Sequence, residues 1–293
     1  MLSGGAGDDR LSGGIGDDML DGGQGIDIAF ISGAKNSFTL TIGPSSATLE
    51  DRRPDGEGAD ILVQIEHLEF GGTQVDAEVD LAALMTVPQI AEADLRNIIE
   101  LYVAYFDRAP DAAGLYFWAG AFADGLSLDG MSQEFSGQAE TLAVYPAGTS
   151  AADFATAVYD NVLGRAPDLD GFNFWVNLLE RGQVQRDAFI LRVLEGVKAV
   201  PLADPGAGFL DQQLADLEFH QTKTDIGAYF SMQLGLSDVQ SATSAMALFD
   251  GSDIGLTDAI AAIGLAHDAA LDPVDGAFLM PMIGVFDDLF AGM

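Results

Sequence analysis

Three aspartates recur at nine-residue intervals near the start of the chain, and their spacing suits the binding of a metal ion. Each is the sixth residue of the pattern G-G-x-G-x-D-x-U-x, in which U is apolar, and three copies follow without a gap from Gly4 to Phe30. The aspartates are Asp9, Asp18 and Asp27, and the apolar positions are Leu11, Leu20 and Ala29. Glycine reaches the positive φ angles of a tight turn. Calcium takes about six to eight oxygen ligands, which carboxylates and inward-facing carbonyls can supply. The pattern therefore predicts calcium binding.

The composition agrees with a cation ligand and excludes other partners. The chain has 293 residues, of which 46 are Asp or Glu and 12 are Lys or Arg, so its formal net charge is -34. Such a charge repels the phosphates of nucleic acids and of anionic membranes. We therefore expect no nucleic-acid partner. The absence of cysteine excludes disulfides, thiolate zinc sites and cysteine nucleophiles.

The array resembles the repeats-in-toxin (RTX) family of secreted bacterial proteins, in which such nonapeptides wind into a calcium-binding parallel β-roll. In that family two nonapeptides complete one coil, so each turn stacks on the turn two repeats later. The resemblance implies a β-roll over residues 1–38, with Ca²⁺ held between Asp9 and Asp27. It also implies that backbone carbonyls of four turn residues complete the ligand shell, namely Gly4, Ala6, Gly23 and Gly25.

The resemblance places Asp18 on the opposite side of the roll, where it would be a further metal ligand. Asn36 falls at the position of its stacking partner, but the opening glycines of that repeat are replaced. We therefore expect this second site to be weak or empty. Asp8 and Asp17 occupy variable positions of the repeat, and we expect them to be solvated surface charges.

Residues 34 to 76 alternate in the manner of β-strands, and we assign residues 39–80 to a β cap of the roll. A polar loop from Asp51 to Asp60 is followed by the run Ile65-Glu66-His67-Leu68-Glu69-Phe70. This run resembles the segment that ends RTX arrays in secreted proteases and related proteins. A cap would protect the strand edges that the last coil leaves unpaired.

A second internal repeat occupies residues 89–205, which we expect to be helical. The segment from Tyr102 to Trp118 returns at a constant offset as the segment from Tyr159 to Trp175, and both contain Arg-Ala-Pro-Asp. The apolar spacing before the first copy is helical, the proline stops the helix, and the aspartate can cap the next one. We favour this structural role for both motifs over a catalytic one.

The duplicated segment resembles a helical domain of unknown function that is common in secreted RTX proteins and is similar to phycobilisome linker domains. Related helical domains anchor some bacterial S-layer proteins to lipopolysaccharide. The resemblance implies that a cell-surface polysaccharide or lipopolysaccharide is a partner of this part of the chain.

We expect residues 206–293 to be a further helical region that ends in a type I secretion signal. No basic and apolar secretory leader precedes the repeats, and the chain ends in an acidic, apolar segment from Val285 to Met293. The RTX resemblance implies export through the type I secretion machinery. Calcium would then fold the acidic roll after it reaches the extracellular medium.

Taken together, the sequence predicts a multidomain protein: a short parallel β-roll with a β cap, followed by a larger all-α helical repeat domain. We expect no enzymatic activity, because no zinc-protease, nucleophile-elbow or nucleotide-binding motif is present. No run of residues is long and apolar enough to span a membrane.

Three functions stay open. The first hypothesis is a secreted, calcium-dependent surface or matrix protein that binds a glycan or another copy of itself. The second is the C-terminal secretion and folding module of a larger hydrolase such as a protease, since the repeats begin abruptly at Met1. The third is a small hydrolase with an unrecognised site.

Overall fold

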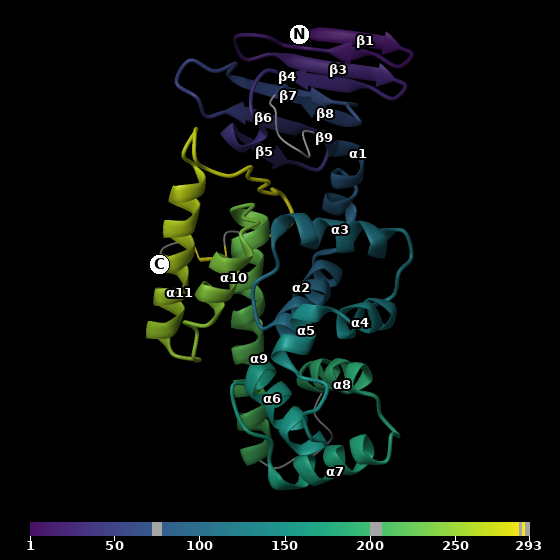
Figure 1. Cartoon of the computed structure of the whole chain (residues 1–293), viewed down its shortest axis with the longest axis vertical. Helices are drawn as coiled ribbons and strands as arrows, with labels where there is room; N and C mark the ends of the chain where they lie inside the picture. Colours follow the sequence, from purple (N-terminus) through teal and green to yellow (C-terminus); the bar gives the residue numbers. More distant parts are fainter. Residues whose placement is uncertain (72–77, 200–206, 287–288, 291–293) are drawn as a thin grey trace.

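A computed structural model describes residues 1–71, 78–199, 207–286 and 289–290. Figure 1 shows an N-terminal β part at one end of an elongated molecule and a larger helical part beneath it. This order of a β part before an α part is the one that the sequence predicts. The described strands form two sheets that contain both parallel and antiparallel pairs.

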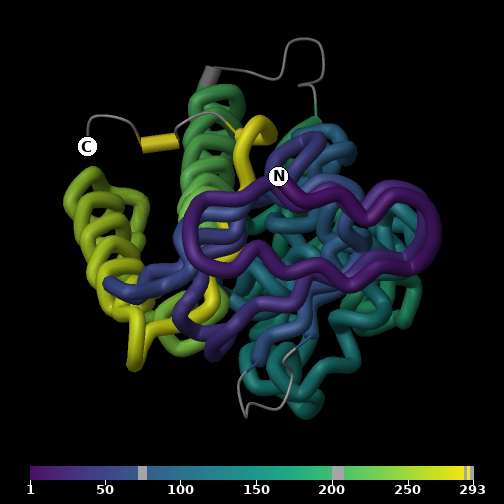
Figure 2. The backbone as a smooth tube through the Cα atoms, turned by 90° about the horizontal axis from the view of Figure 1, so that it is seen from above, coloured from purple at the N-terminus to yellow at the C-terminus, as the bar shows by residue number. Residues whose placement is uncertain are grey.

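The first strands alternate between the two sheets. The strands are β1 (Leu2–Ala6), β2 (Arg10–Leu11), β3 (Met19–Gln24), β4 (Ile28–Ile31), β5 (Phe38–Ile42), β6 (Ala47–Asp51), β7 (Ala59–Val63), β8 (His67–Phe70) and β9 (Glu78–Asp80). One sheet has the order β1-β3-β7-β6-β5 and the other β2-β4-β8-β9. Seen from above, the first residues trace a flattened coil (Figure 2).

The register of these strands matches the repeat length. Leu2 lies opposite Leu20 and Leu11 opposite Ala29, so parallel partners are separated along the chain by the length of two nonapeptides. Leu20 and Ala29 are fully buried between the sheets. The strands of the first sheet also extend into the opening three residues of the next repeat, which the sequence assigned to the turn.

The third layer of the coil comes from a later part of the chain than expected. β7 pairs in parallel with β3, and β8 pairs in parallel with β4. The hairpin β5–β6 is inserted before them and pairs with β7 in the antiparallel direction. Residues 59–70, within the predicted cap, therefore continue the winding that the nonapeptides begin.

Eleven α-helices are present in the described residues. They are α1 (Leu81–Leu84), α2 (Glu92–Phe106), α3 (Ala112–Ala123), α4 (Leu128–Ser136), α5 (Ala139–Val144), α6 (Ala151–Leu163), α7 (Leu169–Glu180), α8 (Arg186–Lys198), α9 (Ala207–Ala228), α10 (Val239–Met246) and α11 (Asp253–Ala270). A short 3₁₀ turn η2 (Val87–Gln89) precedes α2, and a π-helical turn η3 (Tyr229–Gln233) extends α9.

The repeated Arg-Ala-Pro-Asp motif joins α2 to α3 and α6 to α7. Asp111 accepts a hydrogen bond from the Gly114 N–H at 2.7 Å, and Asp168 accepts one from the Gly171 N–H at 2.8 Å. Each aspartate thus caps the following helix, as the sequence predicts. Arg108 pairs with Asp111 and with Glu140 of α5.

The C-terminal region is helical only as far as Ala270, which differs from the expectation for residues 206–293. After α11 the chain crosses back to the β part, and Leu279 to Ile283 run beside β5. The Leu40 N–H donates to the Leu279 carbonyl and the Ile42 N–H to the Pro281 carbonyl, both at 2.8 Å. Pro281 has no N–H, so it disfavours a helix and tolerates a sheet edge. The terminal segment predicted as a secretion signal lies partly outside the described residues.

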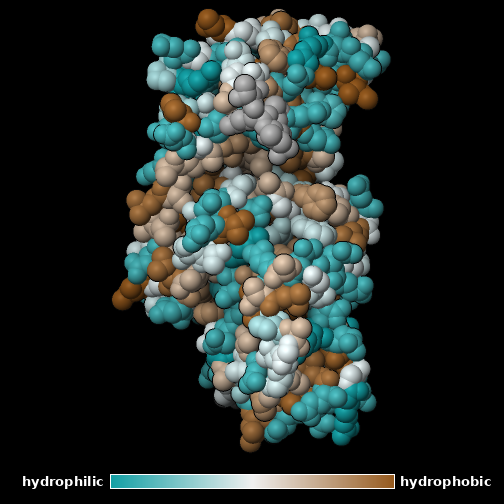
Figure 3. Space-filling model, viewed as in Figure 1, coloured by the Kyte–Doolittle hydropathy of each residue, from teal (hydrophilic) through white to brown (hydrophobic). Residues whose placement is uncertain are grey.

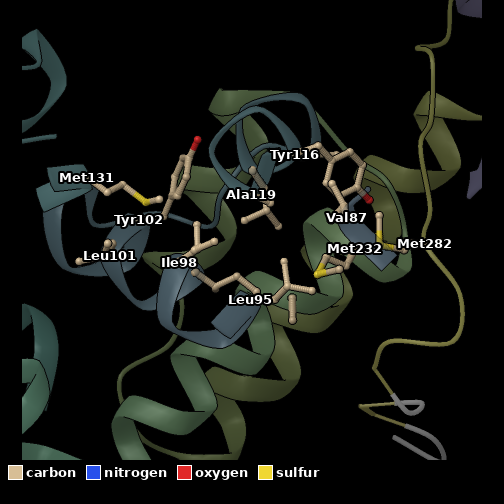
Figure 4. Close-up of a cluster of buried hydrophobic side chains, with 14 of the residues drawn as sticks. Val87, Leu95, Ile98, Leu101, Tyr102, Tyr116, Ala119, Met131, Met232 and Met282 are labelled. Carbon is tan, nitrogen blue, oxygen red and sulfur yellow. The ribbon is translucent and has the colours of Figure 1, made fainter. Parts of the chain in front are cut away.

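One hydrophobic core joins the two parts. It continues from Leu20 and Leu68 in the strands to α2, α6 and α8 and back to Met282. Figure 4 shows its middle, where Tyr116 of α3 meets Met232 and Met282. Apolar side chains on the visible surface are scattered among hydrophilic ones (Figure 3). Within the described ranges, no helix could cross a bilayer.

Candidate calcium site

The parallel register of the coil brings the first and third repeat aspartates together. The Asp9 backbone N–H donates to Asp27 Oδ1 at 2.8 Å, and the Ile28 N–H donates to the Asp9 carbonyl at 2.9 Å. The two turns are thus stacked directly, as the RTX resemblance implies for repeats one and three.

The second carboxylate oxygen of each aspartate has no hydrogen-bond donor. Asp9 Oδ2 and Asp27 Oδ2 are both buried without a partner among the described residues, and the whole of Asp27 is 0% exposed. Neither carboxylate forms an ion pair in the part of the chain that is described. A buried carboxylate without a compensating charge is costly, so a cation fits this position.

The first glycine of each repeat makes room for the carboxylate. A Cβ atom on Gly4 would lie 2.7 Å from Asp9 Oδ2, and one on Gly22 would lie 2.6 Å from Asp27 Oδ2. The second glycine has a different role, because Gly5 and Gly23 have φ angles of 99° and 98°. Only glycine adopts such angles readily. The two opening glycines therefore shape a cradle around the aspartate of their own repeat.

The four residues predicted to contribute carbonyls belong to the first and third repeats, and of these Gly4 lines the cradle of Asp9. Gly4 and Ala6 belong to β1, Gly23 belongs to β3, and Gly25 begins the turn that follows. A Cβ on Gly23 would lie 2.1 Å from the Gly5 carbonyl oxygen, and one on Gly25 would lie 2.3 Å from that of Gly7. The backbones of the stacked turns are therefore in close contact. That the carbonyls of these four residues bind calcium stays a prediction.

Asp18 lies on the opposite side, and its partner is not the one expected from the sequence. The Asp18 N–H donates to Asp60 Oδ1 at 2.9 Å. Asn36 instead lies in the 3₁₀ turn η1 (Lys35–Ser37), and its side-chain amide donates to the Val274 carbonyl at 2.9 Å. The insertion of β5 and β6 moves Asn36 away and lets residues 59–63 pair with β3. The expectation for Asn36 was wrong.

Asp60 is therefore a candidate ligand on this second side. It is 5% exposed. Burial raises the pKa of Asp60, and the nearby charges of Asp18, Glu57 and Asp17 raise it further, whereas the Asp18 N–H lowers it. An excess of negative charge around a buried carboxylate favours a cation here too. The Met1 amino group lies 3.5 Å from Asp18 Oδ1 and offsets part of that charge.

Glu66 extends the first stack by one layer. The Asp27 N–H donates to Glu66 Oε2 at 2.7 Å, just as the Asp9 N–H donates to Asp27. The sequence contains a signal for each of the two residues that the prediction missed, Asp60 and Glu66. The stretch from Asp55 to Val63 reads x-G-x-G-x-D-x-L-x, a nonapeptide that lacks its first glycine, and Glu66 precedes the buried Leu68 by two residues, as Asp27 precedes Ala29.

Asp8 and Asp17 are exposed, but they do more than carry surface charge. Asp8 Oδ1 accepts from the Ile26 N–H and Asp17 Oδ1 from the Ala59 N–H, each at 2.9 Å. Each side chain thus fixes the turn of the next coil layer.

Two family models match parts of the chain. One, described as RTX calcium-binding nonapeptide repeat (4 copies), matches residues 1–29. The other, described as domain of unknown function (DUF4214), matches residues 131–197. No curated protein and no solved structure matches significantly.

The first match confirms RTX-type repeats, which indicate a calcium-binding protein of a kind that is typically secreted. The second supports a helical domain of unknown function, and neither supports the predicted likeness to phycobilisome linkers or S-layer anchors. The described residues contain no group of three or more His, Cys, Asp or Glu side chains arranged to hold a metal. A site here would thus need backbone carbonyls beside its carboxylates.

Proposed function

We propose that the N-terminal coil is a calcium β-roll, and that calcium folds it once the protein is outside the cell. The observation that carries this proposal is the buried Asp27 carboxylate, which is stacked under Asp9 with one oxygen unpartnered. Asp9 and Asp27 would hold one ion with carbonyls of the neighbouring turns, and Asp18 and Asp60 would hold another. Bound calcium would supply positive charge between carboxylates that otherwise repel each other.

This arrangement couples folding to the ion. Without calcium the stacked aspartates oppose folding of the coil, and the net charge of -34 adds general repulsion. Extracellular calcium modules have Kd values of about 10⁻⁴–10⁻³ M, so the coil would fold outside the cell and stay open within it. An open, acidic N-terminal segment suits passage through the type I secretion machinery.

For the full protein, we propose a non-enzymatic role at the bacterial surface or in a matrix, where the helical part binds a glycan. The continuous core supports this proposal, because folding of the coil on Leu20 and Leu68 can stabilise the helices beneath it. Calcium would then control the binding surface without contacting it.

The test is cosedimentation of the purified chain with bacterial envelopes and with purified lipopolysaccharide, in millimolar calcium and in chelator. Binding in calcium alone is the expected result. Absence of binding in both conditions would contradict the surface role and favour the carrier module of a larger hydrolase. Circular dichroism under the same conditions reports separately whether calcium folds the coil.

A further inference from the structure

The two copies of the helical motif differ in the space beside the motif arginine. In the first copy this space is filled by two phenylalanines. The Phe135 ring centroid lies 4.8 Å from that of Phe106 and 4.9 Å from that of Trp118. The Arg108 side chain, stacked against Phe106 and paired with Glu140, is only 5% exposed. The first copy is therefore closed.

In the second copy smaller side chains replace both phenylalanines. Leu163 holds the position in the second repeat that Phe106 holds in the first. Val193 is the eighth residue after the N-cap of α8, as Phe135 is after the N-cap of α4. The second copy contains a cavity of about 230 Å³, and both Leu163 and Val193 line it. The smaller side chains at these two positions leave space beside the motif arginine, although Phe189 of α8 packs against Trp175 with ring centroids 5.2 Å apart.

The cavity lies between α6, α7, α8 and α9 in the part of Figure 1 farthest from the strands. Its lining combines aromatic rings with amides, chiefly those of Tyr159, Trp175, Gln212 and Gln213. Gln213 Oε1 is buried without a hydrogen-bond partner among the described residues. A buried acceptor of this kind fits a ligand that donates a hydrogen bond.

The guanidinium groups at the cavity are already neutralised. Arg165 makes two hydrogen bonds of 2.7 Å to Asp216, and Arg192 pairs with Glu195. No unpaired cation among the lining side chains is left for an anionic ligand, and Asp168 adds a negative charge. The overall charge of -34 also repels acidic polymers. The chemistry thus selects a neutral, hydroxyl-rich ligand.

We propose that this cavity binds one neutral sugar residue of a glycan. A pyranose has an apolar C–H face that can pack on Trp175 and hydroxyls that can bond Gln212 and Gln213. The cavity is smaller than the usual site for a drug-sized ligand of about 300–1,000 Å³, and it suits a single ring. The inference rests on the glycan-binding role proposed above and names the site that performs it.

The test uses the two tryptophans of the full chain as reporters. Trp118→Phe leaves Trp175 at the cavity as the single tryptophan, and Trp175→Phe leaves Trp118 in the closed copy. The probes are methyl α-glucoside, methyl α-mannoside, N-acetylglucosamine and rhamnose, with glucuronate as the charged counterpart, each titrated in calcium. We expect Trp118→Phe to respond to at least one neutral sugar in the millimolar range and Trp175→Phe to stay silent.

Gln212→Ala in the Trp118→Phe background removes the proposed sugar contact together with the 2.8 Å hydrogen bond that Gln212 Nε2 donates to Asp216 Oδ1, and it leaves the apolar core unchanged because Gln212 is exposed. It should weaken sugar binding about tenfold. Gln221→Ala, an exposed glutamine on the same helix away from this cavity, is the matched control and should leave binding unchanged.

A silent Trp118→Phe chain, or a response to glucuronate equal to the neutral one, would overturn the inference. Envelope cosedimentation of the Gln212→Ala chain distinguishes failure of the cavity assignment from failure of the proposed surface role. Retained envelope binding by a variant that no longer binds sugar would place the glycan site elsewhere. A sugar response without envelope binding would support the cavity as a sugar site and refute the surface role.

Discussion

Replacing Asp27 by asparagine should change the stability of the coil in opposite directions with and without calcium. The amide side chain would keep an oxygen to accept the Asp9 N–H, now 2.8 Å from Asp27 Oδ1, but would remove a charge from a position that is 0% exposed. In chelator the wild-type carboxylate is buried and one of its two oxygens has no hydrogen-bond partner, which lowers the free energy of unfolding by about 1–3 kcal/mol. Asp27→Asn should therefore be at least as stable as wild type in chelator.

In calcium the wild-type chain should be more stable than Asp27→Asn. If the site has a Kd of about 10⁻⁴ M, calcium at 100 times that value adds about 2.7 kcal/mol to the free energy of unfolding. For a chain of 293 residues that gain corresponds to a rise in Tm of about 4–5 °C. The Asp27→Asn chain should lose this rise, measured by thermal unfolding followed by circular dichroism in calcium and in chelator.

Asp8→Asn is the matched control. Asp8 lies in the stacked turn above, is exposed, and accepts a backbone N–H at 2.9 Å, so the substitution removes the same charge outside the proposed site. Asp8→Asn should keep the full calcium-dependent rise in Tm. An Asp27→Asn chain that calcium stabilises as much as wild type would refute the assignment of Asp27 as a ligand.

Three further predictions concern the second side of the coil, the returning C-terminal segment and pH. Asp60→Asn should remove one calcium equivalent in a calorimetric titration while Asn36→Ala keeps it, and the reverse result would restore the sequence-based pairing of Asp18. Leu279→Ala, at a position 1% exposed beside β5, should lower the free energy of unfolding in urea by about 2–5 kcal/mol. Val274→Ala at the exposed bend nearby should cost under about 0.5 kcal/mol, and equal costs would show that the returning segment is not packed. Burial lowers the pKa of His267 below 6.5, so the unfolded chain binds more protons, and stability should rise as pH increases from the lowered value to 6.5. His267→Gln should reduce that rise, and an unchanged pH profile of Tm would contradict it.

The nonapeptide period carried most of the local information about the coil. Glycines at fixed positions specified the turns, and an apolar residue every nine positions specified the buried face, as Leu20 and Ala29 show. The helical motif was equally local, because Asp111 and Asp168 cap the helices that begin just after them. These features depend on neighbours a few residues away, so the sequence alone predicts them.

The pairing of distant segments could not be predicted in this way. Counting nine residues onward from Asp27 leads to Asn36, yet the coil skips a hairpin and resumes at Asp60 and Glu66. The degenerate nonapeptide at 55–63 was visible, but nothing local determines whether such a segment forms a separate cap or continues the winding. The strand-like return of Leu279 was missed because its partner Thr39 lies near the opposite end of the sequence.

The sequence by itself thus predicted calcium as the ligand, and it determined the order of β and α parts and the capping of the repeated helices, since all three inferences follow from residue type and short-range spacing. The tertiary structure alone decided which acids are stacked together and which copy of the helical motif is open. Both depend on side chains that meet across the fold, such as Asp18 with Asp60, and on the volume that Phe135 fills and Val193 leaves free.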